Sequence, residues 1–338
     1  MKRATIEDIA QLLGISASTV SRALKDHPDI SSQTKQKVIE AARQLKYLPN
    51  RFAINLKKQE FRTLGVIVPE ITHFFFSSVI KGIEEFCYKY NYSVLLAISN
   101  ENFEIEKKNI RLLMESGAAG ILMSRTKESK DISHITELLN YDIPIVFFDR
   151  FFKELKIDKV IINDEYAAFI AVEHLIKTGC RKIVMFKVPE DIEISKRRKI
   201  GYIEALRSYN VPFNPNLIIN CDNYQNALKE TQKLIDQEVE FDAIFAVNDN
   251  TAVGAIEILK LNKIKIPDQV SVIGFGNDFI SDIISPKLST IEQNGFQMGY
   301  TATQLLVDKI ANDKVTKPRT EVIPTKLILK ETTKKMEQ

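Results

Sequence analysis

One stretch near the N-terminus decides the fold of the first part of the chain: Thr5-Ile6-Glu7-Asp8-Ile9-Ala10-Gln11-Leu12-Leu13-Gly14-Ile15-Ser16-Ala17-Ser18-Thr19-Val20-Ser21-Arg22-Ala23-Leu24. Thr5 can cap a helix because an acid follows three residues later. Apolar residues then recur on one helical face until Gly14. Ser16 can cap a second helix over Ala17–Leu24. The stretch therefore predicts two short helices that meet at a glycine turn.

A third helix is predicted after these two, capped by Ser31 or Ser32. Three such helices form the helix-turn-helix layout, whose second helix presents its N-terminal residues to base edges in the major groove. The alternative is a generic three-helix module in which Ser16–Ser21 are caps and solvated surface. Four hydroxyl residues in those six positions are poor helix formers unless the helix docks on something, which favours DNA binding. The outward candidates are Ala17, Ser18 and Arg22 for base edges, and Ser16, Thr19 and Ser21 for phosphates.

The segment Tyr47–Lys58 predicts a second DNA-contacting element. It begins with a Pro-Asn helix entry and has room for about two helical turns, which are marginal alone in water. We therefore expect this helix to order only when something holds it. Leu56 is followed by Lys57 and Lys58, and a leucine beside two amines suits insertion between base steps of the minor groove.

The charge of the 338-residue chain is unevenly distributed. The formal total is only +3, but residues 1–62 hold 12 Lys or Arg and 6 Asp or Glu, a net charge of +6. The remaining residues carry a net charge of −3. A small basic head on a mildly acidic body indicates that the head meets a polyanion and that the body has another task.

Composition and motifs exclude several classes of protein. The N-terminus has no apolar segment of a secretory signal and no apolar run is long enough to span a bilayer, so we expect a cytoplasmic protein without membrane contact. The three cysteines, Cys87, Cys180 and Cys221, form no CxxC pair and are expected to be buried; no metal or cofactor is expected. Without a nucleophile elbow or Walker loop, the chain is not expected to be an enzyme. A solute-binding transport protein would need a signal sequence and no basic head.

From Thr63 onward, strands alternate with helices in two successive series. Apolar strands that are connected through helices form parallel, doubly wound sheets, so the body is predicted to be an α/β fold of two lobes. In such sheets, ligands bind at the carboxyl ends of the strands. The predicted strands are Leu64–Val68, Ser93–Ile98, Gly120–Met123 and Ile143–Phe148 in the first series, and Lys182–Phe186, Leu217–Cys221, Asp242–Val247 and Val270–Phe275 in the second.

Four motifs carry a family resemblance: Thr5–Ala10, Gly14–Ser16, Thr19–Leu24 and Tyr47–Asn50. With this spacing they resemble the lac repressor (LacI/GalR) family of bacterial regulators, and the resemblance covers nearly the whole chain. It implies a recognition helix at Ala17–Arg22, a hinge helix at about Asn50–Lys58, and Leu56 as the residue that opens the central base step. It also implies a homodimer on a pseudo-palindromic double-stranded DNA operator, and a body like the periplasmic sugar-binding proteins with a small-molecule effector between the lobes. The short polar tail Lys330–Gln338 favours a dimer over a tetramer.

The resemblance implies a division of the chain into three parts, with three crossings between the lobes. Residues 1–47 are expected to form the helix-turn-helix domain and residues 48–61 the hinge helix and linker. Residues 62–338 are expected to form the effector-binding and dimerisation core. The expected first lobe is about 62–162 and 292–318, and the second is about 163–291 and 319–338.

The resemblance also implies which residues meet the ligands. The expected DNA-binding residues are Thr5, Ser16, Ala17, Ser18, Thr19, Ser21, Arg22, Asn50, Ala53, Leu56 and Lys57. The expected effector-binding residues are Phe75, Phe76, Ser124, Asp149, Arg150, Arg198, Asn248 and Gln293. At least one of the two phenylalanines can instead belong to the core.

Two positions depart from the family pattern. Gly276 stands where many members have a sugar-binding Asp, and Asp222 lies where many carry a stacking aromatic. Three arginines, Arg125, Arg150 and Arg198, could instead clamp a carboxylate or phosphate, although Arg150 could equally pair with an acid as part of the structure. The sequence therefore predicts a DNA-binding repressor controlled by a sugar or sugar derivative, with an anionic ligand as one possibility.

Overall fold

The computed structural model describes residues 5–24, 26–45, 62–72, 74–129, 131–188, 192–311 and 317–336. It divides the chain into two compact units, Met1–Phe61 and Arg62–Gln338. Each unit has its own hydrophobic core among the described residues. The predicted hinge segment Tyr47–Lys58 lies outside the described residues.

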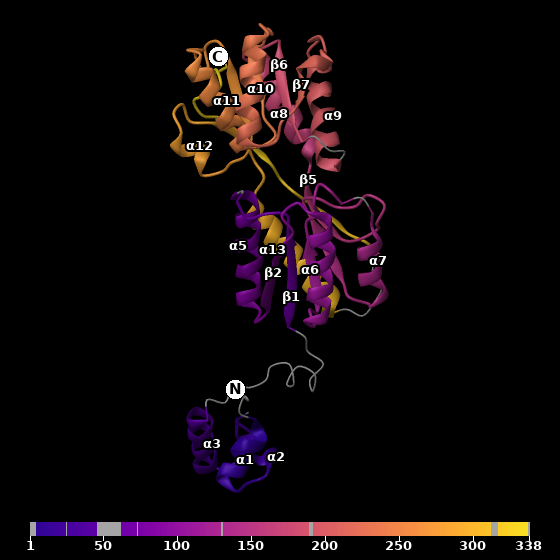
Figure 1. Ribbon diagram of the computed structural model, residues 1–338, viewed down its shortest axis with the longest axis vertical. Helices are drawn as coiled ribbons and strands as arrows, with labels where there is room; N and C mark the ends of the chain where they lie inside the picture. The colour runs from indigo at the N-terminus through magenta and orange to yellow at the C-terminus, as the bar shows by residue number, and fades with distance from the viewer. Residues whose placement is uncertain are drawn as a thin grey trace. The chain divides into compact units, whose positions relative to one another are not determined.

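The described residues of the first unit form a bundle of three short helices (Figure 1). They are α1 (Ile6–Leu13), α2 (Ala17–Leu24) and α3 (Ser32–Gln44). Thr5 caps α1 because its hydroxyl accepts the N–H of Asp8 at 3.2 Å, and the Asp8 carboxylate accepts the N–H of Thr5 in return at 2.7 Å. Gly14 ends α1 with a φ of +63°, a conformation that glycine adopts at little cost.

The remaining caps and the core also follow the predicted pattern. The hydroxyl of Ser16 accepts the N–H of Thr19 at 3.1 Å, and that of Ser31 accepts the N–H of Thr34 at 3.2 Å. Six buried apolar side chains join the three helices: Ile9, Ala10, Val20, Ala23, Val38 and Ala41. The predicted helix-turn-helix head is confirmed.

The second unit holds two six-stranded sheets, with the strand orders β11-β5-β4-β3-β1-β2 and β12-β10-β9-β8-β6-β7. All neighbouring strands are parallel except β10 and β12. The strands of the first sheet are β1 (Thr63–Val68), β2 (Ser93–Ile98), β3 (Gly120–Met123), β4 (Ile145–Phe148), β5 (Lys159–Ile162) and β11 (Thr320–Ile323). Those of the second sheet are β6 (Ile183–Lys187), β7 (Ile218–Asn220), β8 (Ala243–Phe245), β9 (Ser271–Gly276), β10 (Ser289–Glu292) and β12 (Lys326–Ile328).

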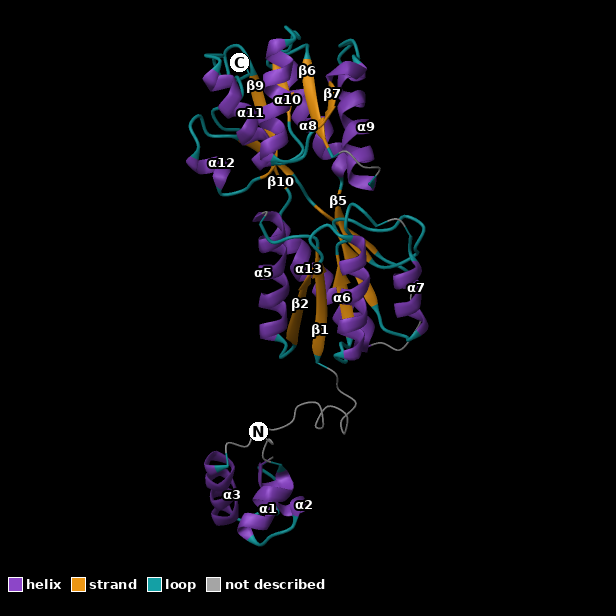
Figure 2. Cartoon of the chain, in the orientation of Figure 1, coloured by secondary structure: helices purple, strands orange, loops and turns teal. Residues whose placement is uncertain are grey.

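Helices cover both sheets (Figure 2), so the predicted two-lobed α/β fold is confirmed. The first lobe carries α5 (Phe74–Lys89), α6 (Phe103–Glu115), α7 (Ser133–Asn140) and α13 (Gly295–Ala311). The second carries α8 (Asp164–Lys177), α9 (Glu193–Ser208), the 3-10 turn Pro215–Leu217, α10 (Tyr224–Asp236), α11 (Asp249–Leu261) and α12 (Ile280–Ile283). In Figure 1 the gold helix α13 lies among the indigo and purple elements of the first lobe, although it comes late in the chain.

Glycines allow two helix pairs to pack closely. A Cβ atom at Gly82 of α5 would lie 2.0 Å from the carbonyl oxygen of Phe296 in α13. A Cβ atom at Gly201 of α9 would lie 2.0 Å from the carbonyl oxygen of Glu165 in α8. Any larger residue at either position would force the two helices apart, because the clash is with backbone.

Three short segments join the lobes: one after β5, one after β10 and one after β11. The last crossing differs from the sequence expectation, which placed residues 319–338 in the second lobe. Thr320–Ile323 instead pairs in parallel with β5 of the first sheet, and only β12 joins the second sheet. Pro324 separates these two short strands, and so short an apolar run does not reveal its partner.

Candidate functional site

Six of the residues predicted to meet DNA lie on α2 or at its cap, and a seventh, Thr5, caps α1. Ser18 and Arg22 are exposed, and they lie one helical turn apart on the same face. Ala17, Thr19 and Ser21 are half-buried, while Ser16 is exposed and caps the helix. Four further predicted DNA-binding residues lie outside the described part of the chain: Asn50, Ala53, Leu56 and Lys57.

A cavity lies in the second unit between the two lobes. Its walls come from the loops and helix ends that follow the carboxyl ends of the strands, as expected for open parallel sheets. The first lobe contributes Glu70, Phe74, Phe75, Phe76, Lys127, Asp149 and Arg150. The rest of the lining is Val188, Ile194, Arg198, Asp222, Val247, Asn248, Asp249, Asn250, Phe275, Gly276, Asp278 and Gln293.

Seven of the eight predicted effector-binding residues line this cavity; the exception is Ser124. Ser124 directly follows β3, where its backbone N–H donates to the carbonyl oxygen of Ile67 at 3.0 Å, and the residue is fully buried. Arg125 is also absent from the lining: its guanidinium carbon lies 4.4 Å from the ring centroid of Phe152, and Nη2 donates to the carbonyl oxygen of Ser129 at 2.8 Å. The predicted set of three cleft arginines is therefore reduced to two.

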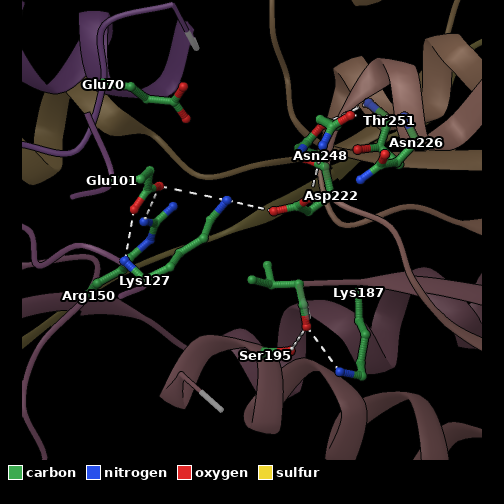
Figure 3. Close-up of polar contacts among 12 residues, drawn as sticks. Glu70, Glu101, Lys127, Arg150, Lys187, Ser195, Asp222, Asn226, Asn248 and Thr251 are labelled. Atoms are coloured by element: carbon green, nitrogen blue, oxygen red, sulfur yellow. Dashed lines mark hydrogen bonds and ion pairs between the residues drawn. The ribbon is translucent and has the colours of Figure 1, made fainter. Parts of the chain in front are cut away.

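Arg150 is held by acids of the first lobe, as Figure 3 shows for Glu101. Its Nη1 donates to Glu101 Oε1 at 2.7 Å, and its Nε lies 3.6 Å from Asp149 Oδ2. Its guanidinium carbon lies 5.6 Å from the centroid of Phe76. Burial raises the pKa of Asp149 to about 6 despite the neighbouring guanidinium.

Arg198, on α9, lines the cavity from the second lobe. Its Nε donates to Asp164 Oδ1 at 2.7 Å, and its Nη1 donates to the carbonyl oxygen of Val247 at 2.9 Å. Its guanidinium carbon lies 3.6 Å from the centroid of the Phe275 ring. Arg198 is only 5% exposed, and burial raises the pKa of Asp164 although Arg198 opposes the shift. The arginine thus holds the start of α8 and presents its guanidinium face to an aromatic ring.

Two carboxylates, Asp249 and Asp278, line the cavity near Gly276, where the carboxylate common in the family is missing. Asp249 Oδ2 accepts the N–H of Asp278 at 2.7 Å, and Oδ1 accepts the hydroxyl of Thr290 at 2.6 Å. A Cβ atom at Gly274 would lie 2.2 Å from Asp249 Oδ1, so this glycine makes room for the carboxylate. Burial raises the pKa of Asp249 to about 6.

The sequence does not predict Lys127 as a cavity residue, because no local pattern marks it. It lies in the loop after β3, and its Nζ is 2.6 Å from Asp222 Oδ2 in the other lobe (Figure 3). The two residues are 95 positions apart in the chain. Other lining residues that were not predicted as ligand contacts, such as Glu70, Phe275 and Asp278, also follow strand ends.

Within the described ranges, no group of three or more His, Cys, Asp or Glu side chains is placed to hold a metal ion. None of the helices described here is long and apolar enough to cross a membrane.

Both units match models of known protein families. Residues 5–50 match the model of bacterial regulatory proteins of the lacI family, and residues 62–331 match that of periplasmic binding proteins and the sugar-binding domain of the LacI family. The chain belongs to the lacI family of bacterial regulatory proteins. It is therefore a DNA-binding transcriptional repressor of this family that is regulated by a ligand.

Individual relatives of this lacI-family repressor match along most of its length. It is 31% identical to the transcriptional repressor PurR of Vibrio parahaemolyticus, over 98% of this chain and 99% of that protein. The lac repressor dimer bound to operator and an anti-inducer has the same fold, with a TM-score of 0.85 at 22% identity and coverage of 98% and 99%. A LacI-family regulator of Enterococcus faecium with bound ribose gives a TM-score of 0.71 at 27% identity, with coverage of 80% and 98%.

The cavity of this lacI-family repressor is acidic. Its lining includes five carboxylates: Glu70, Asp149, Asp222, Asp249 and Asp278. It includes three cations, and each contacts a carboxylate within 2.7 Å: Lys127 with Asp222, Arg150 with Glu101 and Arg198 with Asp164. Each of these cations is therefore bonded to one of the protein's own acids, and the buried Nε of Arg150 has no hydrogen-bond partner among the described residues.

One buried acceptor in the cavity is left without a partner. Gln293 directly follows β10 and is 6% exposed, and its Oε1 has no hydrogen-bond partner among the described residues. An unpaired buried amide oxygen costs about 1–3 kcal/mol. A ligand that donates a hydrogen bond to this oxygen would remove that cost.

Proposed function

We propose that this repressor senses a neutral, polyhydroxylated ligand, a sugar or a molecule that carries one, in the cavity between its lobes. The observation that carries the proposal is that each of the three cations among the described lining residues is already bonded to a carboxylate. An anionic ligand would have to displace these acids and would then meet the remaining carboxylates of the lining, which is unfavourable in a partly buried site.

The polar groups of the cavity suit hydroxyl groups. Carboxylates such as Asp149 accept hydrogen bonds from hydroxyls, the Gln293 Oε1 atom needs a donor, and Asn248 also lines the cavity. Phe75, which is half-buried, offers apolar surface to the C–H face of a sugar ring. The ribose bound by the regulator of Enterococcus faecium is a ligand of this chemical class.

The head is proposed to bind double-stranded operator DNA through α2, with Ser18 and Arg22 facing base edges. Leu56 and Lys57 remain proposed minor-groove contacts from outside the described residues. A pseudo-palindromic operator needs two heads, so we propose a homodimer. Such a regulator acts where the chromosome is, in the bacterial cytoplasm.

The exposed edge of the first sheet supports a dimer. Strand β2 ends the strand order of that sheet, and its Leu95 and Leu96 are 39% and 44% exposed. Tyr88 on the preceding helix is also exposed. Natural proteins rarely leave an apolar edge strand open to solvent, so a second copy of the chain is the proposed cover.

The proposed mechanism is thermodynamic linkage between cavity and head. A ligand that contacts both lobes binds more tightly when they are closed, so it changes the balance between the open and closed states of the core. If the two states hold the heads of a dimer differently, the same coupling free energy changes operator affinity.

Ligand-induced thermal stabilisation tests the ligand class. D-ribose and related neutral sugars should raise the unfolding temperature of the full chain, since a ligand at 100 times its Kd contributes about 2.7 kcal/mol. Ribose 5-phosphate, the matched anion, should have no effect at the same concentration. Gln293→Met should abolish the shift, whereas Gln297→Met, at an exposed position of α13, should preserve it. Stabilisation by phosphorylated sugars alone would overturn the proposal.

A further inference from the structure

The side chain of Lys127 crosses the cavity from one lobe to the other. Its Nζ is 2.6 Å from Asp222 Oδ2 of the second lobe and 3.7 Å from Glu101 Oε1 of the first. Figure 3 shows the ammonium group between these two carboxylates. The cation therefore ties an acid of one lobe to an acid of the other.

The first-lobe end of this contact is fixed by a buried acid. Glu106 is fully buried, and its carboxylate accepts the N–H of Thr126 at 2.6 Å and the hydroxyl of Ser129 at 2.7 Å. The N–H of Lys127 itself donates to Glu101 Oε2 at 2.8 Å. The loop that carries Lys127 is thus held on both sides of the lysine.

Asp222, the second-lobe partner of Lys127, is also held in place by neighbouring residues. The carbonyl oxygen of Asp222 accepts the side-chain N–H of Asn248 at 2.8 Å, and Asp222 Oδ1 accepts that of Asn223 at 3.2 Å. The Lys127 and Asp222 side chains are 20% and 11% exposed, respectively, so water and salt screen the pair less than a surface pair. Two pre-positioned partners lose little side-chain entropy when they meet.

We propose that the Lys127–Asp222 pair is a latch that holds the lobes together before any ligand binds, and that its strength sets the affinity for the effector. The proposal rests on the proposed function in that the closed core is the ligand-binding state. Opening the cavity separates the two charges, so the open state loses their mutual attraction. A latch that favours the closed state therefore lowers the conformational cost that a ligand must overcome.

The distance between the lobes of the ligand-free protein tests the latch directly. Spin labels at Lys108→Cys in α6 and Gln225→Cys in α10 would report it by double electron–electron resonance on the full chain, diluted with unlabelled protein. The native cysteines Cys87, Cys180 and Cys221 are buried and should not react. We expect one dominant short distance without ligand.

Neutralising either partner should open the core. Lys127→Gln and Asp222→Asn should each lower the closed-to-open ratio by about tenfold, and the double variant should show no further loss. The swapped pair Lys127→Asp with Asp222→Lys should restore the short distance. Lys156→Gln, at an exposed position of the first lobe, is the matched control and should change nothing.

An unchanged distance distribution in Lys127→Gln would overturn the latch, as would additive effects of the two single variants. Neither ligand nor DNA enters this measurement, so it can fail while a neutral sugar still stabilises the protein. Conversely, a latch can be present even if the ribose test above fails.

Discussion

Replacing Arg198 by methionine should destabilise the second lobe far more than the loss of an exposed surface ion pair would. Arg198 is buried, and Nε and Nη1 form bonds of 2.7 Å to Asp164 and 2.9 Å to the carbonyl oxygen of Val247. Methionine fills part of the volume but leaves the Asp164 carboxylate, itself 7% exposed, without a cation. Breaking a buried pair in this way costs about 3–5 kcal/mol of unfolding free energy.

The neighbouring arginine provides a matched control. Arg197 lies on the same helix and contacts Glu193 at 2.9 Å and Glu165 at 3.1 Å, but its side chain is 50% exposed. Arg197→Met should therefore cost less than about 1 kcal/mol. Urea unfolding followed by circular dichroism should show a midpoint lowered by about 1 M or more in Arg198→Met, for a slope near 3 kcal/mol/M.

A second substitution separates the charge from the packing. Adding Asp164→Asn to Arg198→Met removes the unpaired carboxylate and should recover at least half of the lost stability. The deficit of the single variant should also shrink toward pH 5, because protonation relieves the buried charge. Equal losses in Arg198→Met and Arg197→Met would refute the reasoning.

Three further predictions follow from buried acids and from the head. The folded pKa of Asp249, about 6, exceeds its ordinary value of 3.8, so the folded state binds the proton more tightly and unfolding free energy should fall as pH rises from about 4 to 6. In Asp249→Asn, the decrease in unfolding free energy between about pH 4 and pH 6 should be smaller by about 3 kcal/mol. Identical pH profiles of unfolding free energy for the variant and the wild type would contradict this prediction. Glu106→Gln should lower the free energy of unfolding by about 2–4 kcal/mol, because it disturbs the hydrogen bonds from Thr126 and Ser129. The control Glu104→Gln changes a side chain that is 74% exposed and should leave the free energy of unfolding almost unchanged. Similar losses of stability for the two variants in calorimetry would refute this prediction. Leu56→Ala should weaken operator binding at least tenfold more than binding to random DNA in gel shifts, and equal weakening would exclude the wedge.

The elements were predictable because their patterns are local. Ser93–Ile98 is a strand in both the prediction and the structure, since an apolar run between a helix and a turn signal suffices to mark it. The caps at Thr5 and Ser16 were equally local. The last crossing was not, because Thr320–Ile323 takes its partner from β5, far away in the chain.

For the cavity residues, too, local features could be predicted from the sequence and long-range partners could not. Arg150 and Arg198 could be named from their places after a strand and in a family motif, but their acidic partners could not, since Glu101 and Asp164 come from other elements. Ser124 was misplaced because a residue next to a strand end can point into the core as easily as into a cleft. Lys127 has no local signal, and its role depends on Asp222 across the cavity.

The most direct test of ligand-controlled DNA binding is fluorescence anisotropy of the full chain on a palindromic duplex obtained by in vitro selection. The salt concentration would be varied from 50 to 200 mM, with and without D-ribose or whichever neutral sugar raises the unfolding temperature. We expect affinity to fall by about 10³-fold or more over this range, as for six or more phosphate contacts, and the sugar to change affinity by about fivefold or more at fixed salt. An affinity that is insensitive to salt, or that no stabilising sugar alters, would contradict the assignment of the head to DNA and of the cavity to its control.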